Sequence, residues 1–449
     1  MIALAIKNFL RSKVAVASLL FILLAGIVSI HIGKQFLQKQ EAAIAKTAAF
    51  QKEHIHRNVQ FFDKEIGLLL YYLKFSLVNK PSNLNALSIG QRDVNVTIQS
   101  VTIKNLEAQK YDTDLYNPSN LLAGNLDYSF VLIYLFPLLI IALSYNLLSE
   151  EKEGETWRLI SVQAKNPLRY LWQKLAIRAV AVYAALAVIL GYAMVILSLL
   201  LNAAFIAVVC LSVMYIAFWF ALSFWAMSWH KSSSVNAVSL LSFWMLLTIV
   251  CPAVANSYLI NKYPVPEAMH TAIEQRDGYH EKWDMDKRIT TDAFYTHYPQ
   301  FKKYPLPNKQ FSWLWYYAMQ QMGDDDAKEQ ATAMQKKLRL REQVSNNIAR
   351  PVPTIFTQLQ LNNLTHSGLS NHLDFLDSTN KFHEKMRLYF YPKIFEEAAV
   401  NEQDWHQWQV EYFGKEEKVK WIKLLLPLAI LIVVLLVPGY INLKRMKNM

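Results

Sequence analysis

Residues 149–174 form a charge-dense stretch between two long apolar segments. Its acidic residues are Glu150, Glu151, Glu153 and Glu155, and its basic residues are Lys152, Arg158, Lys165, Arg169 and Lys174. Apolar residues such as Trp157 and Ile160 alternate with these charges, a pattern typical of an amphipathic segment at a membrane surface. Charged groups of both signs favour ion pairing with a protein partner, which sets orientation and encounter. The simpler interpretation is an interfacial helix that only joins two membrane spans.

The chain lacks the loop by which many proteins hold nucleotide phosphates. That loop requires Gly, four residues, and then Gly-Lys-Ser/Thr. The two Gly-Lys pairs, at Gly33 and Gly414, have no glycine five residues upstream. The close histidine pair, His54 and His56, is two residues apart and points to different faces of a helix, which is poor metal geometry. We therefore expect no catalytic set, cofactor or metal in this chain, and any ATP and Mg²⁺ on a partner subunit.

Six segments are apolar enough to cross the roughly 30 Å core of a bilayer, which requires about 20 residues of helix. They are Val14–Ile32, Tyr128–Leu148, Ala176–Leu201, Ala203–Ser228, Val235–Ile260 and Trp421–Leu443. None has a charged residue near its middle. Ion-coupled transporters usually place carboxylates or histidines there, so their absence counts against ion-coupled transport.

Basic residues predict the orientation of these spans. The N-terminal stretch, residues 149–178, the turn after the fourth span and the C-terminal tail hold 13 basic and 4 acidic residues together. Six spans place all four stretches on one side, which we predict to be the cytoplasm, with both termini there. The formal net charge of +11 therefore reflects membrane topology and not a nucleic-acid partner.

Two polar blocks are predicted outside the cytoplasm, residues 34–127 and 261–420. The first is expected to continue the first span as a helix over residues 35–75, followed by a strand over 94–103. The second is expected to be helical over 328–349 and 371–397, with a loop over 298–307 and a break at Arg350–Pro353. Exposed aromatic residues are expected to lie on lipid or a partner: Trp313, Trp315, Tyr316 and Tyr317. Both cysteines fall in spans, so no disulfide framework is expected.

The predicted fold is an all-α polytopic membrane protein with two mainly helical extracytoplasmic insertions and a short β element in the first. The predicted regions follow in chain order: 1–33, N-terminus and first span; 34–127, first periplasmic block; 128–148, second span; 149–175, cytoplasmic segment; 176–260, third to fifth spans; 261–420, second periplasmic domain; 421–449, last span and tail.

The segment after the second span resembles the coupling region of type-2 ATP-binding-cassette (ABC) exporter permeases. In that family the second span runs into Glu-x-Glu-x-Gly-Thr-Leu-Arg, followed by a Pro, an Arg and a Lys. The matching positions here are Glu151, Lys152, Glu153, Gly154, Glu155, Thr156, Trp157 and Arg158, with Arg169 and Lys174 further on. The chain departs from the pattern because Glu155 replaces the usual Gly, Trp157 replaces Leu, and Pro167 comes late. These departures affect the conformation of the local turn and not the overall role that the resemblance implies.

The arrangement of the later spans and the large block before the last one resembles a sub-family of these permeases with an uncharacterised periplasmic domain. The similar positions in that block are Pro353, Leu359, Leu364, His372, Phe375 and His383. The resemblance implies two copies of a separate ATPase subunit and a second permease chain, identical or paralogous, in a bacterial inner membrane.

Two functional hypotheses remain from the sequence. The leading one is the permease subunit of an ABC exporter, with Glu151, Glu153, Gly154, Thr156, Arg158, Arg169 and Lys174 coupling it to the ATPase. The alternative is a membrane-anchored periplasmic sensor or scaffold that acts through a partner. Under either hypothesis the outer blocks are candidates to contact a periplasmic partner.

Overall fold

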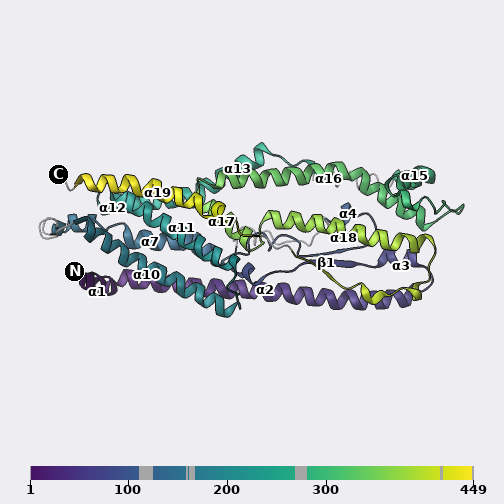
Figure 1. The fold of residues 1–449 in the computed structure, drawn as a ribbon, viewed down its shortest axis with the longest axis horizontal. Helices are drawn as coiled ribbons and strands as arrows, with labels where there is room; N and C mark the ends of the chain where they lie inside the picture. Colours follow the sequence, from purple (N-terminus) through teal and green to yellow (C-terminus); the bar gives the residue numbers. More distant parts are fainter. Residues whose placement is uncertain are drawn as a thin grey trace.

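A computed structural model describes residues 2–110, 125–157, 160, 167–267, 281–414 and 418–446. The molecule is elongated and mainly helical, with a helix bundle in one half and a second folded unit in the other (Figure 1). Six helices in the described residues are long and apolar enough to cross a membrane, as predicted: Lys13–Phe61, Tyr128–Glu153, Arg169–Ile196, Ala203–Met227, Ser233–Lys262 and Trp421–Arg445. The chain is therefore a multi-pass membrane protein.

The bundle contains five of these helices and the first half of the remaining one, Lys13–Phe61. Its elements are α1 (Ile2–Arg11), the first half of α2 (Lys13–Phe61), α6 (Tyr128–Phe130), η2 (Val131–Leu135), α7 (Phe136–Ser144), α8 (Ser149–Glu153), α10 (Pro167–Ile196), α11 (Ala203–Met227), α12 (Ser233–Met245), η3 (Leu246–Val250), α13 (Cys251–Lys262) and α19 (Trp421–Met446). Helix α11 and the second span are the two most enclosed of these spans, and Tyr215 and Trp219 of α11 are fully buried.

Two spans contain a π-helical turn directly before a proline region. The turn η2 precedes Pro137, and η3 precedes Pro252. Proline has no N–H and cannot donate to the preceding turn, so carbonyl oxygens there need other donors. The buried Tyr215 hydroxyl donates to the Ile133 carbonyl at 2.9 Å, and the Thr354 hydroxyl donates to the Leu247 carbonyl. Each turn is thus held by a hydroxyl from another helix.

Helix α2 connects the two halves of the molecule. Its 49 residues extend about 74 Å at 1.5 Å per residue, more than twice the thickness of a bilayer core. The predicted helical continuation of the first span is therefore confirmed, although the helix ends at Phe61 and not at residue 75. Gly33 lies near its middle, where a Cβ would approach the Ala86 carbonyl oxygen to 2.1 Å. Glycine here permits the close crossing of η1 (Asn83–Ala86) over α2.

The second unit is built from both polar blocks. Its further elements are α3 (Ile66–Tyr72), β1 (Phe75–Asn79), β2 (Ile98–Val101), α4 (Glu107–Lys110), α15 (Lys287–His297), η4 (Pro299–Phe301), α16 (Trp313–Ala349), α17 (Pro353–Leu364), α18 (Leu369–Phe395), η5 (Val400–Glu402), η6 (Trp405–Gln407) and β3 (Glu411–Phe413). The helices predicted over 328–349 and 371–397 and the break at Arg350–Pro353 are confirmed as α16, α18 and the start of α17.

A small sheet joins the two blocks. Its strand order is β2-β1-β3, with β1 antiparallel to β2 and parallel to β3. The predicted strand over 94–103 is confirmed in its second half as β2, but β1 and β3 were not predicted. Since β3 comes from the second block, the two polar blocks form one unit. Residues of both, including Phe75, Tyr317 and Phe390, share one apolar core.

The expected exposure of the aromatic run at the start of α16 is wrong. Trp315 and Tyr316 are each 4% exposed and Tyr317 is fully buried. Trp313 is partly buried and packs against the same core. Gly67 lets α3 approach this run closely, and the Tyr317 hydroxyl donates to the Gly67 carbonyl at 2.9 Å. These rings therefore fill the core of the second unit and do not face lipid.

Candidate functional site

The segment after the second span lies at one end of the bundle. Figure 1 shows both chain termini at this same end, opposite the second unit. The Arg178 guanidinium lies 5.9 Å from the Phe9 ring of α1, and Trp172 stacks on Phe224 near the end of α11 at 4.6 Å. The stretches that sequence analysis predicted on one side of the membrane are therefore close together in space.

Glu151 is the centre of a polar cluster in this segment. Its carboxylate accepts from the Lys174 ammonium at 2.6 Å, from the Tyr170 hydroxyl at 2.9 Å, and from the Thr156 hydroxyl. The side chains of Glu151 and Lys174 are only 15% and 11% exposed. A buried ion pair needs further hydrogen bonds of this kind, and the Tyr170 and Thr156 hydroxyls supply them to the Glu151 carboxylate. Lys174 also donates to the Leu147 carbonyl at 3.4 Å. The cluster fixes the end of the second span against the start of the third.

Glu153 makes a second link, to the start of the fifth span. Its carboxylate accepts from the Ser233 backbone N–H at 2.7 Å and from the Ser233 hydroxyl at 2.8 Å. The Ser149 hydroxyl lies 2.8 Å from the same Ser233 oxygen, which accepts its hydrogen bond. A carboxylate at a helix N-terminus is favoured by unpaired N–H groups and by the helix dipole. Glu153 therefore fastens α8 to the first turn of α12.

A sharp turn follows α8. Gly154 is its C-cap with φ −84°, and Glu155 takes the left-handed conformation with φ +57°. Glycine is the residue best suited to positive φ, and it is usual at the position of Glu155 in the permease pattern. The departure noted in the sequence thus falls on the one residue of this turn that adopts the left-handed conformation. Glu153, Gly154, Glu155 and Thr156 are exposed and form the outer face of the turn.

The other predicted residues have different surroundings. Arg158 lies outside the described residues. Arg169 is exposed near the start of α10, and Trp157 packs partly against the bundle core. Helix α10 begins at Pro167, nine residues before the predicted start at Ala176, because proline suits the first helical position.

Sequence reasoning missed Tyr170, Ser233 and Thr354. Tyr170 was accessible to it, because an α10 that begins at Pro167 places Tyr170 and Lys174 four residues apart on one helix face. Ser233 is 80 residues from Glu153 along the chain, and no local pattern indicates their contact.

The far end of the bundle contains a third link, between the fifth span and the second unit. Thr354 is buried in the first turn of α17, and its hydroxyl bonds the Leu247 carbonyl in the π-helical turn of the span. Phe356 and Leu361 of α17 belong to the bundle core. The fifth span therefore contacts the Glu153 turn at its first residue and α17 near its middle.

Comparison with known proteins gives one family match. Residues 267–411 match the family described as "Domain of unknown function (DUF3526)", which covers most of the second block. No match was found among curated proteins or among solved structures. The matched region includes α15, α16, α17 and α18, so this part of the second unit is similar to a domain family of unknown function.

Proposed function

We propose that this chain is the permease subunit of an ABC transporter, and that a separate ATPase docks on the turn after the second span. The observation that carries the proposal is the double attachment of this turn. Glu151 binds it to the third span and Glu153 binds it to the fifth, while Gly154, Glu155 and Thr156 remain exposed. A partner that pushes on the exposed face therefore acts on three spans together.

The positive-inside pattern supports a cytoplasmic location for this turn and an extracytoplasmic location for the second unit. The absence of a phosphate-binding loop in the sequence supports a separate ATP-binding subunit. Export as the direction of transport, and pairing with a second permease chain, follow from the resemblance in the sequence.

The hydrogen bonds of the turn change the roles that we propose for its residues. Because Glu151 and Glu153 bond within the chain, we assign them the role of positioning the turn. The exposed residues Gly154, Glu155 and Thr156 then contact the ATPase.

A contiguous set of contacts can carry a movement to the second unit. Closure of two ATPase subunits on ATP would move the turn, and Glu153 would pass this movement to α12. The π-helical turn η3 is a site where the fifth span can bend. Thr354 then connects this turn to α17. In this mechanism ATP biases two states of the spans, and the second unit follows the fifth span.

Co-purification tests the proposal. The tagged chain, solubilised in mild detergent from its native membrane, is expected to recover a subunit with a phosphate-binding loop. Glu151→Ala combined with Glu153→Ala is expected to lower the recovered ATPase by about tenfold, a loss of about 1.4 kcal/mol in affinity. Glu150→Ala is the matched control, because the Glu150 side chain is exposed and has no hydrogen-bond partner within the described ranges.

Recovery of no ATPase, or equal recovery with the double variant and the control, would contradict the proposal. Recovery of a signalling kinase in its place would support the sensor or scaffold hypothesis. Because Glu151 also contributes to folding, the yield and thermal stability of each variant are measured on the same preparation.

A further inference from the structure

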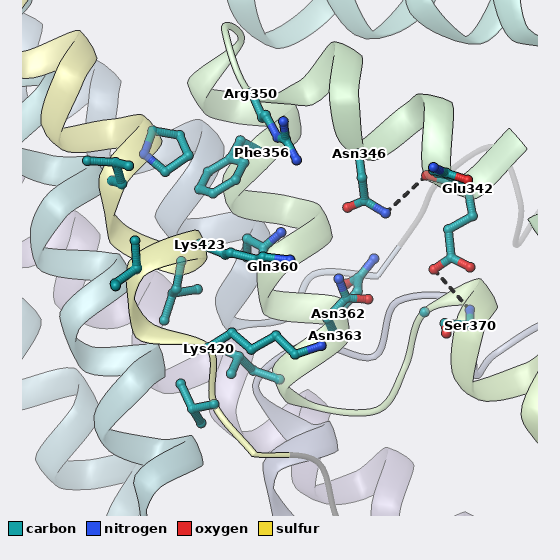
Figure 2. A pocket seen from close by; sticks show the side chains of 18 of the residues that line it. Glu342, Asn346, Arg350, Phe356, Gln360, Asn362, Asn363, Ser370, Lys420 and Lys423 are labelled. Carbon is teal, nitrogen blue, oxygen red and sulfur yellow. Dashed lines mark hydrogen bonds between the residues drawn. The ribbon is translucent and has the colours of Figure 1, made fainter. Parts of the chain in front are cut away.

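A cavity of about 1210 Å³ lies where the second unit meets the bundle. Its walls come from α16, α17 and the start of α18, which follow one another in the chain, and from the start of α19, which lies further along it. Figure 2 shows Arg350, Lys420 and Lys423 around it, with the amide side chains of Gln360, Asn362 and Asn363 between them. Nothing in the coupling role of the turn after the second span accounts for this cavity.

The polar part of the cavity has an excess of unpaired positive charge. Its two carboxylates are already bound: Glu342 accepts from the Ser370 N–H at 3.1 Å, and Asp374 pairs with Arg339 at 3.0 Å. In contrast, the side chains of Arg350, Lys420 and Lys423 have no hydrogen bond or ion pair with any residue that the structure describes. Amide groups beside guanidinium and ammonium groups form the donor set that binds phosphate or carboxylate.

The rest of the cavity is apolar and follows the last span. Ile422, Leu426 and Ile430 are spaced four residues apart, so they share one face of α19. Their side chains are 76%, 50% and 53% exposed, and Phe356 of α17 closes the wall behind them. Lys420 and Lys423 flank Trp421, where the span begins, which is the level at which basic side chains reach lipid head groups. The cavity is therefore cationic at its outer level and apolar along the span.

We propose that this cavity binds one anionic phospholipid of the surrounding bilayer. The phosphate would lie among Arg350, Lys420 and Lys423, and an acyl chain would lie along Ile422, Leu426 and Ile430. Two properties select this class of ligand. The unpaired cations select an anionic head group over a zwitterionic one, and the apolar face adds affinity with each methylene group that leaves water. This inference concerns binding and does not rest on the proposed function.

The test uses the purified full chain in a neutral detergent. Binding of dioctanoyl phosphatidylglycerol below its micellar concentration is compared by native mass spectrometry with that of dioctanoyl phosphatidylcholine, which has the same chains. We expect one tightly bound phosphatidylglycerol per chain and at least tenfold weaker phosphatidylcholine. Glycerol 3-phosphate, the head group alone, is expected to compete only at concentrations about 100-fold higher. Equal binding of the two lipids by the unaltered chain would overturn the proposal without any variant.

A triple variant locates the site. Arg350→Gln, Lys420→Gln and Lys423→Gln together are expected to weaken phosphatidylglycerol binding about 100-fold, since a basic residue near an anionic lipid contributes on the order of fivefold. The matched control removes three exposed lysines of the second unit: Lys302→Gln, Lys328→Gln and Lys336→Gln. The control should bind as the unaltered chain does. Undiminished binding by the first variant, or a cavity closed by a second copy in disulfide trapping at Lys423→Cys, would also overturn the proposal.

Discussion

A largely buried ion pair occurs near each end of this molecule, and the two pairs have different structural roles. In the second unit, Arg387 pairs with Asp324 at 2.7 Å, with side chains 3% and 12% exposed. Asp324 also accepts from the Leu106 and Glu107 N–H groups, so this pair ties α16, α18 and the first block together inside the unit. At the bundle end, the similarly buried pair of Glu151 and Lys174 lies directly beneath an exposed turn. One pair stabilises a core, and the other positions a surface.

The largest expected effect is the loss of Arg387. Arg387→Met leaves Asp324 buried without a cationic partner, and it should lower the free energy of unfolding of the second unit by about 3–5 kcal/mol. The measurement is pulse proteolysis in urea on the full chain. Arg339→Met is the control, because its pairs with Asp374 and Asp377 are partly exposed and should contribute less than about 1 kcal/mol. Equal losses in the two variants would show that burial does not determine how much these ion pairs contribute to the free energy of unfolding.

Acid is the next largest perturbation, and it should act on the second unit. Burial lowers the pKa of His383 well below its ordinary value, and it lowers the pKa of His372 to about 4. Both rings are neutral in the folded chain, whereas the unfolded chain binds protons below about pH 6.5. Stability is therefore complete above pH 6.5 and falls as the pH decreases, by up to about 1.4 kcal/mol per pH unit for each histidine.

His383→Gln tests this pH dependence. The His383 Nε2–H donates to the Thr102 carbonyl at 2.9 Å, and a glutamine amide can replace that donor. The variant should show a smaller loss of thermal stability between pH 7 and pH 5 than the unaltered chain. An unchanged slope would mean that His383 does not titrate on unfolding in this range.

A smaller effect is expected at the junction of the two halves. Thr354→Val preserves the side-chain shape but leaves the Leu247 carbonyl without its hydroxyl donor, which should cost about 1–3 kcal/mol of thermal stability. Tyr215→Phe should act similarly at Ile133 in the other π-helical turn. Thr296→Val is the control, since the Thr296 hydroxyl is exposed and bonds only a carbonyl of its own helix. Loss of stability with the control alone would contradict this account of the two turns.

The smallest expected effect is a gain at the exposed turn. Glu155→Gly should raise stability by about 1 kcal/mol, because a left-handed conformation is unfavourable for residues with a Cβ. Gly154→Ala should not raise stability, since Gly154 already has a negative φ and an added Cβ would lie in tight contact, 3.2 Å from the Glu150 carbonyl oxygen. Thermal unfolding of both variants, followed by differential scanning calorimetry, checks which of the two is the more stable. A destabilising Glu155→Gly would mean that the Glu155 side chain makes a contact that outweighs the backbone strain.

Local patterns predicted the spans and several helices of this fold. The six apolar segments, the extension of α2 and the break before Pro353 follow from hydropathy, periodicity and proline chemistry. The sheet was only partly predicted, because β1 and β3 are short and the residues that pair between them are 334 positions apart in the sequence (Leu77 and Glu411). The aromatic run at Trp315 was misjudged for a related reason: its burial depends on α3, which lies over 240 residues earlier in the sequence.

The sequence predicted which residues form the candidate turn but not the contacts that these residues make. Charge and resemblance identified Glu151, Glu153 and Lys174, yet a sequence does not tell whether a carboxylate faces a partner or its own chain. The contacts of Glu151 with Tyr170 and of Glu153 with Ser233 depend on where α10 and α12 begin. Helix starts of this kind are the least certain feature of any pattern-based prediction.

The most direct test of the central claim is photo-crosslinking from the exposed turn in intact cells. A photoreactive amino acid at Glu155 should crosslink this chain to a subunit that carries a phosphate-binding loop, whereas the same probe at the exposed Lys302 of the second unit should not. An ATPase crosslinked from Glu155 alone is the predicted result. Crosslinking of the ATPase from Lys302, or labelling of Glu155→Cys by a membrane-impermeant reagent added outside spheroplasts, would contradict the account.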